Sequence, residues 1–320
     1  MKLDIIIPAY NAHGTIDKAL ASIATQKLDS EDEMRVIIVN DASPDGDYNA
    51  CAAYWSSVLH VAVVNKKINE GCGQARQTGM DVSDADAVMF VDADDVLGSP
   101  FACRTLLAEI KNGCDMAVGE FIEETIRKTI VNHGMNWIWC HGKMYSLKFI
   151  REHDIRFNLT RGNEDVGFNS VFHALTDNIV YIPQVVYIWQ NYSESTVRKD
   201  ADGYSYDYGW RDFIENMAWA VEEMKKRGVS EDFICDFDGA ILARMYYQFA
   251  GAHKHFPEKD GENLAKLRDF WKRACAPYAE KLTDEGLEEN FLKLTMQDGG
   301  NIITIPHLTY EAFLKELKHE

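Results

Sequence analysis

The sequence predicts an α/β fold in which a mostly parallel, mixed sheet is flanked by helices and followed by a helical C-terminal region. Two observations lead to this prediction. In the first third of the chain, short apolar runs alternate with helix-like segments, which is typical of βαβ units and a parallel sheet. From about residue 204, amphipathic helical periodicity replaces that alternation, so we expect two parts, residues 1–203 and residues 204–320.

The individual elements follow from these patterns. We expect strands at residues 3–8, 35–40, 58–65 and 87–91, and helices at residues 15–26, 73–82 and 166–175. β-branched residues at 116–124 and 129–131 indicate a mixed extension of the sheet, and residues 137–157 fit a short helix among loops. In the C-terminal part, helices are expected at residues 210–227, 231–253, 262–276, 284–296 and 310–318.

Composition narrows the class of protein. The formal net charge is -18, which opposes binding to nucleic acid or to an anionic membrane. The seven cysteines form no Cys-x-x-Cys pair, no apolar run is long enough to span a membrane, and the first residues do not fit a secretory signal. We therefore expect a cytoplasmic protein without an integral membrane segment.

Three carboxylates directly follow the fourth expected strand. The apolar run Val88–Val91 ends in Asp92, Asp94 and Asp95. Ligands bind beyond the carboxyl ends of parallel strands, and crowded carboxylates repel one another unless a cation such as Mg²⁺ or Mn²⁺ lies between them. The alternative is a solvated acidic turn.

Polar residues also follow the first two expected strands and open the next helix. Pro8 and Tyr10 end the first strand, and Asp41 follows the second. The glycine-bearing loop at residues 69–73 leads into a helix that carries Arg76, whose planar guanidinium suits a base edge or a phosphate. Because the ends of parallel strands gather on one edge, these groups can surround one nucleotide, although Asp41 alone also fits a turn residue.

Taken together, these elements resemble the family 2 nucleotide-sugar glycosyltransferases, which have the Rossmann-like GT-A fold. The resemblance covers roughly residues 1–200 and rests on four ordered motifs: Ile5–Asn11, Val39–Ser43, Asn69–Gly79 and Asp92–Asp95. It implies a nucleotide site formed by Pro8, Tyr10, Asp41, Arg76 and Asp92, with Asp41 and Arg76 at the nucleobase and Asp92 near the ribose. It also implies that Asp94 coordinates the metal on the diphosphate, and it leaves the role of Asp95 open.

The expected catalytic carboxylate lies farther along the chain. Glu164-Asp165 looks like the family's Glu-Asp motif, in which the residue matching Asp165 removes the proton of the acceptor hydroxyl. Glu164 is expected to orient its neighbours. The same pair also fits the acidic first turn of a helix, and the two interpretations are compatible.

Two further segments resemble parts of the family's substrate site. The resemblance implies that Trp139 stacks on a sugar and that Lys143 and Arg198 contact the acceptor or the diphosphate, with residues 187–199 closing over the donor. Trp139 also fits the core, and residues 198–205 also fit a polar linker. His141 is either a structural histidine or a further metal ligand.

The sequence thus predicts an inverting, Mn²⁺- or Mg²⁺-dependent glycosyltransferase. The resemblance implies a UDP-sugar donor, and the acceptor is a hydroxyl group such as that of a polysaccharide precursor. The alternatives are a haloacid-dehalogenase-type phosphatase with Asp92 as nucleophile and Asp94 as acid/base, a sugar-nucleotide pyrophosphorylase, and an inactive nucleotide-sugar-binding module. The helical region is expected to serve acceptor recognition or the formation of a homo-oligomer.

Overall fold

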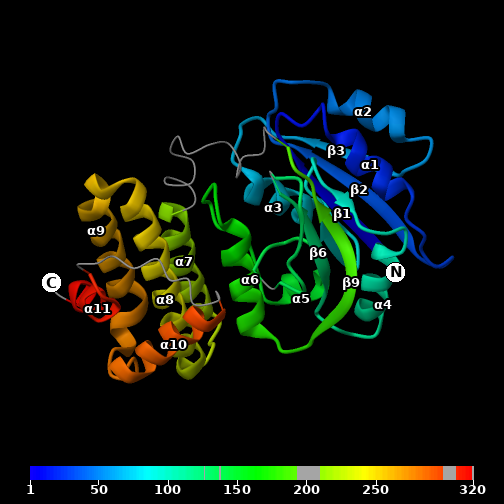
Figure 1. The fold of residues 1–320 in the computed structure, drawn as a ribbon. Helices are drawn as coiled ribbons and strands as arrows, with labels where there is room; N and C mark the ends of the chain where they lie inside the picture. The colour runs from blue at the N-terminus through cyan, green and yellow to red at the C-terminus, as the bar shows by residue number, and fades with distance from the viewer. Residues whose placement is uncertain (126, 137, 193–209, 298–307, 319–320) are drawn as a thin grey trace. The chain divides into compact units, whose positions relative to one another are not determined.

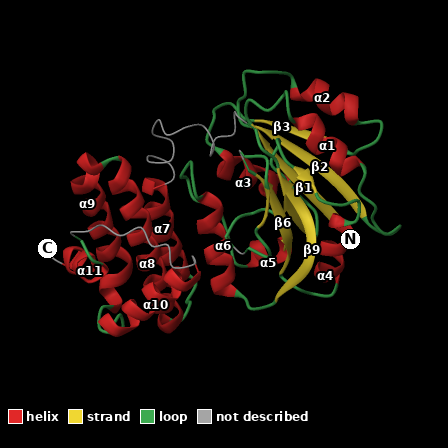
Figure 2. Ribbon diagram, in the orientation of Figure 1, coloured by secondary structure: helices red, strands yellow, loops and turns green. Residues whose placement is uncertain are grey.

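A computed structural model describes residues 1–125, 127–136, 138–192, 210–297 and 308–318 (Figure 1). The contacts divide the chain into two compact units, Met1–Lys199 and Asp200–Glu320. The first unit contains the sheet, and the second is helical (Figure 2). Each unit is described by itself.

The first unit is built on a nine-stranded mixed sheet with the order β3-β2-β1-β4-β8-β6-β9-β5, in which β7 pairs with β6. Its parallel half consists of the four strands expected from the apolar runs: β1 (Lys2–Ala9), β2 (Glu33–Asn40), β3 (Val61–Asn65) and β4 (Ala87–Phe90). The third strand starts later than predicted, because Val58 and Leu59 end a turn in which their amides donate to Trp55 O.

The other half of the sheet mixes directions. The strand β8 (Lys143–Ser146) lies antiparallel between β4 and β6 (Met116–Glu124), and β9 (Ile179–Trp189) runs parallel to β6. Two short strands complete it, β5 (Val96–Leu97) on β9 and β7 (Ile130–Asn132) on β6. The strands β5, β8 and β9 were not predicted.

Helices cover both faces of the sheet (Figure 1). Along β1, Leu3, Ile5 and Ile7 join the core formed with α1 (Ile16–Ala24), α2 (Tyr48–Trp55) and α4 (Ala102–Lys111). Ile6 points to the opposite face, where α3 (Cys72–Val82) packs so closely that a Cβ on Gly79 would lie 2.4 Å from Ile6 Cγ2. Because successive side chains of a strand point to opposite faces of the sheet, β1 is buried on both faces.

The other face also carries α5 (Leu147–Glu152) and α6 (Glu164–Leu175). Phe90 of β4 packs there against Tyr145 of β8, Phe157 and Phe168 of α6, with ring centroids 5.5–6.3 Å apart. These aromatic contacts fix α6 against the sheet. The first turn of α6 therefore has a defined position beside the carboxyl ends of the parallel strands.

The second unit contains five α-helices among its described residues, all close to the predicted ranges: α7 (Asp212–Lys226), α8 (Glu231–His255), α9 (Asp260–Phe270), α10 (Asp284–Gln297) and α11 (Tyr310–Lys318). The helix predicted to reach residue 276 changes to a π-helical turn at Trp271–Cys275. Met217, Met224 and Met245 are fully buried, which confirms the apolar stripes as packing faces. No helix in the described ranges has the length and apolarity needed to cross a bilayer.

Candidate functional site

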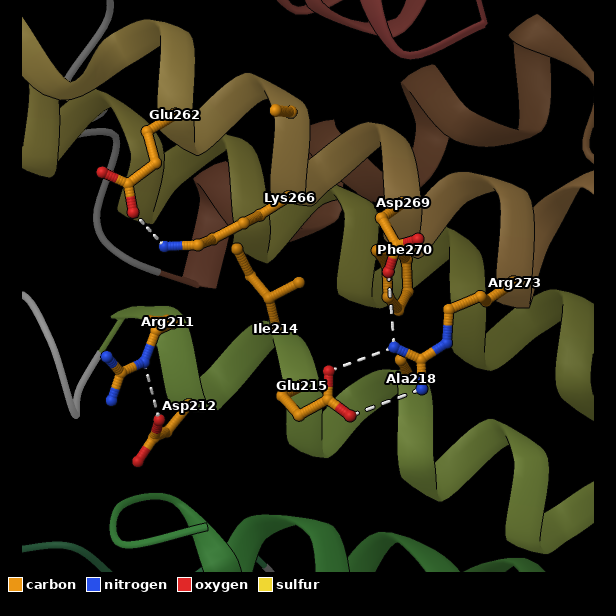
Figure 3. A pocket seen from close by; sticks show the side chains of 11 residues that line it. Arg211, Asp212, Ile214, Glu215, Ala218, Glu262, Lys266, Asp269, Phe270 and Arg273 are labelled. Atoms are coloured by element: carbon orange, nitrogen blue, oxygen red, sulfur yellow. Dashed lines mark hydrogen bonds and ion pairs between the residues drawn. The ribbon is translucent and has the colours of Figure 1, made fainter.

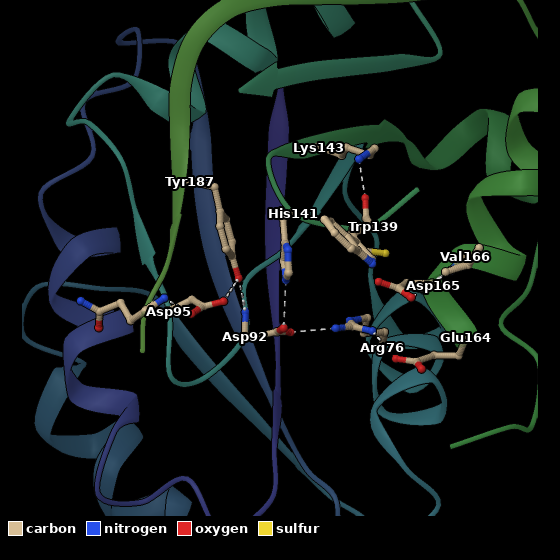
Figure 4. A network of polar contacts seen from close by, with 12 residues as sticks. Arg76, Asp92, Asp95, Trp139, His141, Lys143, Glu164, Asp165, Val166 and Tyr187 are labelled. Carbon is tan, nitrogen blue, oxygen red and sulfur yellow. Dashed lines mark hydrogen bonds and ion pairs between the residues drawn. The ribbon is translucent and has the colours of Figure 1, made fainter. Parts of the chain in front are cut away.

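Arg76 joins two carboxylates from different parts of the chain at the carboxyl edge of the sheet (Figure 4). Its Nη2 donates to Asp92 Oδ1 at 2.8 Å, and its Nη1 donates to Glu164 Oε1 at 2.7 Å. The arginine is only 4% exposed. Charge-assisted bonds in such a sheltered place are strong and directional, so Arg76 fixes the start of α6 relative to the end of β4.

Glycines allow α3 and α6 to approach this closely. Gly71 precedes α3 with a φ of +94°, a backbone conformation that L side chains rarely adopt. A Cβ on Gly73 would lie 2.6 Å from Glu164 Cγ, so a larger residue would displace Glu164. A further link is made by Arg161, whose Nη1 donates to Asn69 Oδ1 at 2.7 Å.

The two carboxylates that Arg76 joins differ in their pKa. Burial, together with the charge of Asp165, raises the pKa of Glu164 to about 7, although Arg76 opposes this change. Burial also tends to raise the pKa of Asp92. The positive charge of Arg76 and the neighbouring His141 outweigh burial and hold this pKa below the usual range. Asp92 is therefore ionised at neutral pH, and the pKa of Glu164 lies well above that of Asp92.

Asp165 lies next to Glu164 in the first turn of α6, and both side chains project toward Arg76 (Figure 4). Asp165 is half-buried, and its Oδ1 accepts a hydrogen bond from the Val166 amide at 2.9 Å. The preceding Asn163 has a φ of +56°, which turns the chain sharply into the helix. Asp165 thus keeps access to solvent beside a buried charge network.

Asp95 is held in the wall of the site. The Tyr187 hydroxyl donates to Asp95 Oδ2 at 2.7 Å, and the Gln190 amide donates to Oδ1 at 2.8 Å. Tyr187 Oη also accepts a bond from the Asp92 amide at 3.2 Å. Burial and the charges of Asp94 and Asp92 raise the pKa of Asp95 well above its usual value. Asp95, whose role the sequence left open, is thus in contact with Tyr187 of β9.

His141 approaches the same acidic cluster from the loop before β8. Its Nε2 lies 3.5 Å from Asp92 Oδ2, and its ring stacks on Tyr187 with centroids 4.9 Å apart. Trp139, which is half-buried, packs near it with centroids 6.3 Å apart and also contacts Phe121. Trp139 therefore belongs to an aromatic cluster at the edge of the site.

The described residues place one ligand atom each of Asp92, Asp95 and His141 within 4.8 Å of one another. Carboxylate oxygens and an imidazole nitrogen are a donor set that suits Mn²⁺ and related ions. His141 Nδ1 is buried without a hydrogen-bond partner, so the ring is not held by the protein's own polar groups. Asp94, the metal ligand predicted from the sequence, is half-buried and adjoins this group without belonging to it.

The other residues predicted to contact the nucleotide lie at or just beyond the carboxyl ends of β1 and β2. Asp41 is 2% exposed and accepts a bond from the Gly71 amide at 2.8 Å, and Lys66 Nζ lies 2.7 Å from its Oδ1. Asp41 therefore holds the loop that begins α3. Pro8 is buried at the end of β1, whereas Tyr10 is 49% exposed.

Two expectations about the accessory segments require correction. Lys143 is fully buried, and its ammonium donates to the backbone carbonyls of Asn136 and Trp139, which leaves it no route to a phosphate. Tyr187 and Trp189 were expected in a closing segment but belong to the strand β9. Arg198, the third predicted accessory contact, lies outside the described residues.

The helical unit contains a separate cavity of about 540 Å³ between α7 and α9 (Figure 3). Its three cationic side chains all form ion pairs with acids in the same wall: Arg211 with Asp212, Lys266 with Glu262, and Arg273 with Glu215 and Asp269. Each cation of the cavity is thus paired with an acid of its own lining.

Comparison with known proteins identifies the family. A sequence model described as glycosyl transferase family 2 matches residues 4–167, just over half of the chain. The chain belongs to glycosyl transferase family 2. The matched part runs from Asp4 in β1 to Gly167 in α6, and so it includes Asp41, Arg76, the Asp92–Asp95 cluster and Asp165. Membership of this family excludes the phosphatase interpretation, which required Asp92 as a nucleophile.

Solved structures support the GT-A fold of this family 2 protein. Residues 1–349 of TarS from Staphylococcus aureus, in complex with UDP-GlcNAc, align with a TM-score of 0.69 and 18% identity. The alignment covers 93% of this chain and 92% of that one. At this identity, the likeness establishes the fold alone.

Curated relatives of the family 2 protein are glycosyltransferases of greater length. GlyA of Streptococcus pneumoniae is 23% identical over 59% of this chain and 30% of its own length. A poly(ribitol-phosphate) beta-glucosyltransferase of Bacillus spizizenii is 30% identical over 38% of this chain and 19% of its own length. TarS is 24% identical over 89% of this chain and 50% of its own length. The chain thus spans between a fifth and a half of these relatives.

Proposed function

We propose that this family 2 protein is an inverting, metal-dependent glycosyltransferase that uses a UDP-sugar as donor and a hydroxyl group as acceptor. The donor is supported by the TarS structures with bound UDP and UDP-GlcNAc. The acceptor class is supported by the relatives that glycosylate poly(ribitol-phosphate), a hydroxyl-bearing polymer. A surface-polysaccharide precursor is an acceptor that agrees with both of these observations.

The observation that carries this proposal is the placement of Asp165. Its carboxylate stands beside Glu164, which Arg76 ties to Asp92 at the end of β4. In the proposal, Pro8, Tyr10, Asp41, Arg76 and Asp92 surround the nucleoside. The acceptor then lies between Asp165 and the anomeric carbon.

The reaction is a single displacement. Asp165 takes the proton from the acceptor hydroxyl as its oxygen forms a bond to the anomeric carbon, and the bond from that carbon to the diphosphate oxygen breaks. UDP leaves with the bonding electron pair, and the anomeric configuration is inverted. A bound Mn²⁺ or Mg²⁺, held with Asp94 as a ligand, would neutralise charge on the departing diphosphate.

Two variants test these assignments. Asp165→Asn keeps the shape of the side chain but cannot accept the proton, so we expect turnover to fall by about 10²–10⁴-fold while UDP-sugar affinity stays near that of the unchanged protein. Asp177→Asn, exposed just beyond the other end of α6, is the matched control. UDP release measured over a nucleotide-sugar panel decides the issue, and full turnover by Asp165→Asn would remove Asp165 as the base.

The second variant is Asp94→Ala, for which we expect the loss of metal-dependent donor binding in calorimetry. Donor affinity that responds to Mn²⁺ as strongly in the variant as in the unchanged protein would exclude Asp94 as a ligand. Release of UDP at an undiminished rate in EDTA would refute the metal dependence while leaving the transferase activity intact.

A further inference from the structure

His141 is held rigidly at the acidic cluster. The next residue, Gly142, has a φ of +66°, and a Cβ there would lie 3.1 Å from Gly119 O of β6, so the loop presses directly on the sheet. The imidazole stacks on Tyr187 and meets Phe121 edge-on with centroids 5.3 Å apart. Its side chain is only 12% exposed. The protein thus fixes both the position and the plane of this ring.

Among the described residues, Nδ1 of His141 has no hydrogen-bond partner and Nε2 has only a long contact with Asp92. Nδ1 is buried without a partner, and Nε2 lies 3.5 Å from Asp92 Oδ2. That separation exceeds the usual range of about 2.7–3.2 Å for an N–H···O bond. Buried polar groups are almost always satisfied, so Nδ1 needs a small partner such as a water molecule, and Nε2 is the nitrogen that faces Asp92.

The same separation fits two ligands of one metal ion. For metal–ligand distances of about 2.1 Å, neighbouring ligands lie about 3.0 Å apart in an octahedral site and about 3.4 Å apart in a tetrahedral one. The 3.5 Å between Nε2 and Asp92 Oδ2 is close to the tetrahedral value and about 0.5 Å longer than the octahedral one. Asp92 can use Oδ2 in this way because its Oδ1 is the atom bonded to Arg76.

The charge around the ring also favours a cation. Asp92, Asp94 and Asp95 bring three carboxyl groups to one strand end, and the basic groups that act on Asp92 are Arg76 and His141 itself. Tyr187 and Gln190 already use both oxygens of Asp95, which keeps that carboxyl against β9. A cation between Asp92 and His141 would offset the repulsion among the acids.

We propose that His141 Nε2 is a ligand of the metal ion in this site, with Asp92 Oδ2 beside it, and that this nitrogen makes the site selective for Mn²⁺ over Mg²⁺. Mg²⁺ prefers oxygen ligands, whereas imidazole is a ligand of first-row transition ions, the series that begins with Mn²⁺. The inference rests on the proposed metal-dependent transfer and adds a ligand and an ion preference to it. Asp94, two residues from Asp92, remains a further proposed ligand.

Pulsed electron paramagnetic resonance on the Mn²⁺-loaded full chain, with and without UDP, tests this proposal directly. A coordinated imidazole nitrogen gives a ¹⁴N hyperfine coupling to Mn²⁺, which we expect in the unchanged protein. His141→Gln should abolish it, and His133→Gln should retain it. His133 is the matched control because it stacks on Phe121 in the same aromatic cluster and pairs with Glu123.

Metal titrations give a second readout. Loss of a group that only orients a ligand lowers metal affinity by about 10–100-fold, so His141→Gln should weaken Mn²⁺ binding by at least about tenfold while Mg²⁺ binding changes less. No ¹⁴N coupling in the unchanged protein, or a coupling that persists in His141→Gln, would overturn the inference even if UDP is released normally. A histidine coupling without UDP release from any nucleotide sugar would instead refute the proposed function and leave the ligand assignment standing.

Discussion

Asp238 is a carboxyl group buried in the helical unit, and neither of its oxygens has a hydrogen-bond partner among the described residues. Burial raises its pKa to about 7, and the charge of Lys225 on α7 opposes this change only in part. Its other titratable neighbours are Cys235, Cys275 and Tyr278, whose pKa values are also raised by burial. Asp238 therefore keeps its proton in the folded protein at pH values where an exposed aspartate has lost it.

The sign and size of the effect follow from this difference. Between the ordinary pKa of 3.8 and the folded value of about 7, the folded chain binds one proton more than the unfolded chain, so the free energy of unfolding falls as pH rises. The slope is about 1.4 kcal/mol per pH unit, which gives a loss of about 3 kcal/mol between pH 5 and pH 8. For a unit of this size, that corresponds to roughly 10 °C in the melting temperature.

Thermal and urea unfolding from pH 5 to pH 8, monitored by far-ultraviolet circular dichroism, measures this loss. In Asp238→Asn the new side chain carries no charge at any of these pH values. The part of the pH dependence of the free energy of unfolding that comes from Asp238 should therefore disappear, and the variant should be the more stable protein at pH 8. Asp236→Asn, on the exposed side of the same helix, should keep the dependence of the unchanged protein. Parallel pH profiles for the unchanged protein and Asp238→Asn would refute the reasoning, because they would mean that Asp238 ionises normally or is not buried.

Three further predictions concern the sheet-bearing unit. Arg76→Met removes the partner of two carboxylates, and we expect the free energy of unfolding in urea to fall by about 3 kcal/mol; an unchanged midpoint would mean that the bridge is not formed. Gly79→Ala places a Cβ against Ile6 and should cost about 1–3 kcal/mol, whereas Gly14→Ala, which meets nothing within 4 Å, should be neutral; equal melting temperatures would exclude the close packing of α3 on β1. Lys143→Met leaves two partly buried carbonyls without their donor and should cost about 2 kcal/mol while UDP affinity is kept. A selective loss of UDP affinity instead would restore the phosphate contact first expected of Lys143.

The parallel half of the sheet was predictable because each strand is an apolar run that ends in a polar residue. Apolar runs of this length between polar segments usually form strands that are buried on both faces. The polar residues that follow them mark the edge of the sheet at which these strands end. The placement of Asp41 and Asp92 on one edge therefore follows from local pattern alone. The β2 end is joined to β1 by the Asp41 amide, which donates to Ala9 O at 2.9 Å.

The other half of the sheet was not predictable from local pattern. Lys143–Ser146 forms a strand of only four residues between β4 and β6, and so short a segment has no periodicity that distinguishes it from a loop. Its insertion brings His141 to Asp92, which is why the sequence left the role of that histidine open. Tyr187 was placed in a closing segment for a related reason, since its aromatic and polar neighbours resemble a loop motif as much as a strand.

The bridge from Arg76 to Glu164 gives a physical reason for the different roles that the sequence predicted for Glu164 and Asp165. Glu164 is 7% exposed, and its carboxylate is committed to an arginine 88 positions earlier in the chain. Asp165, on the next position of the helix, is rotated by about 100° and keeps partial exposure. A general base must reach the acceptor oxygen, and of these two carboxylates only Asp165 combines such access with a position fixed by its buried neighbour.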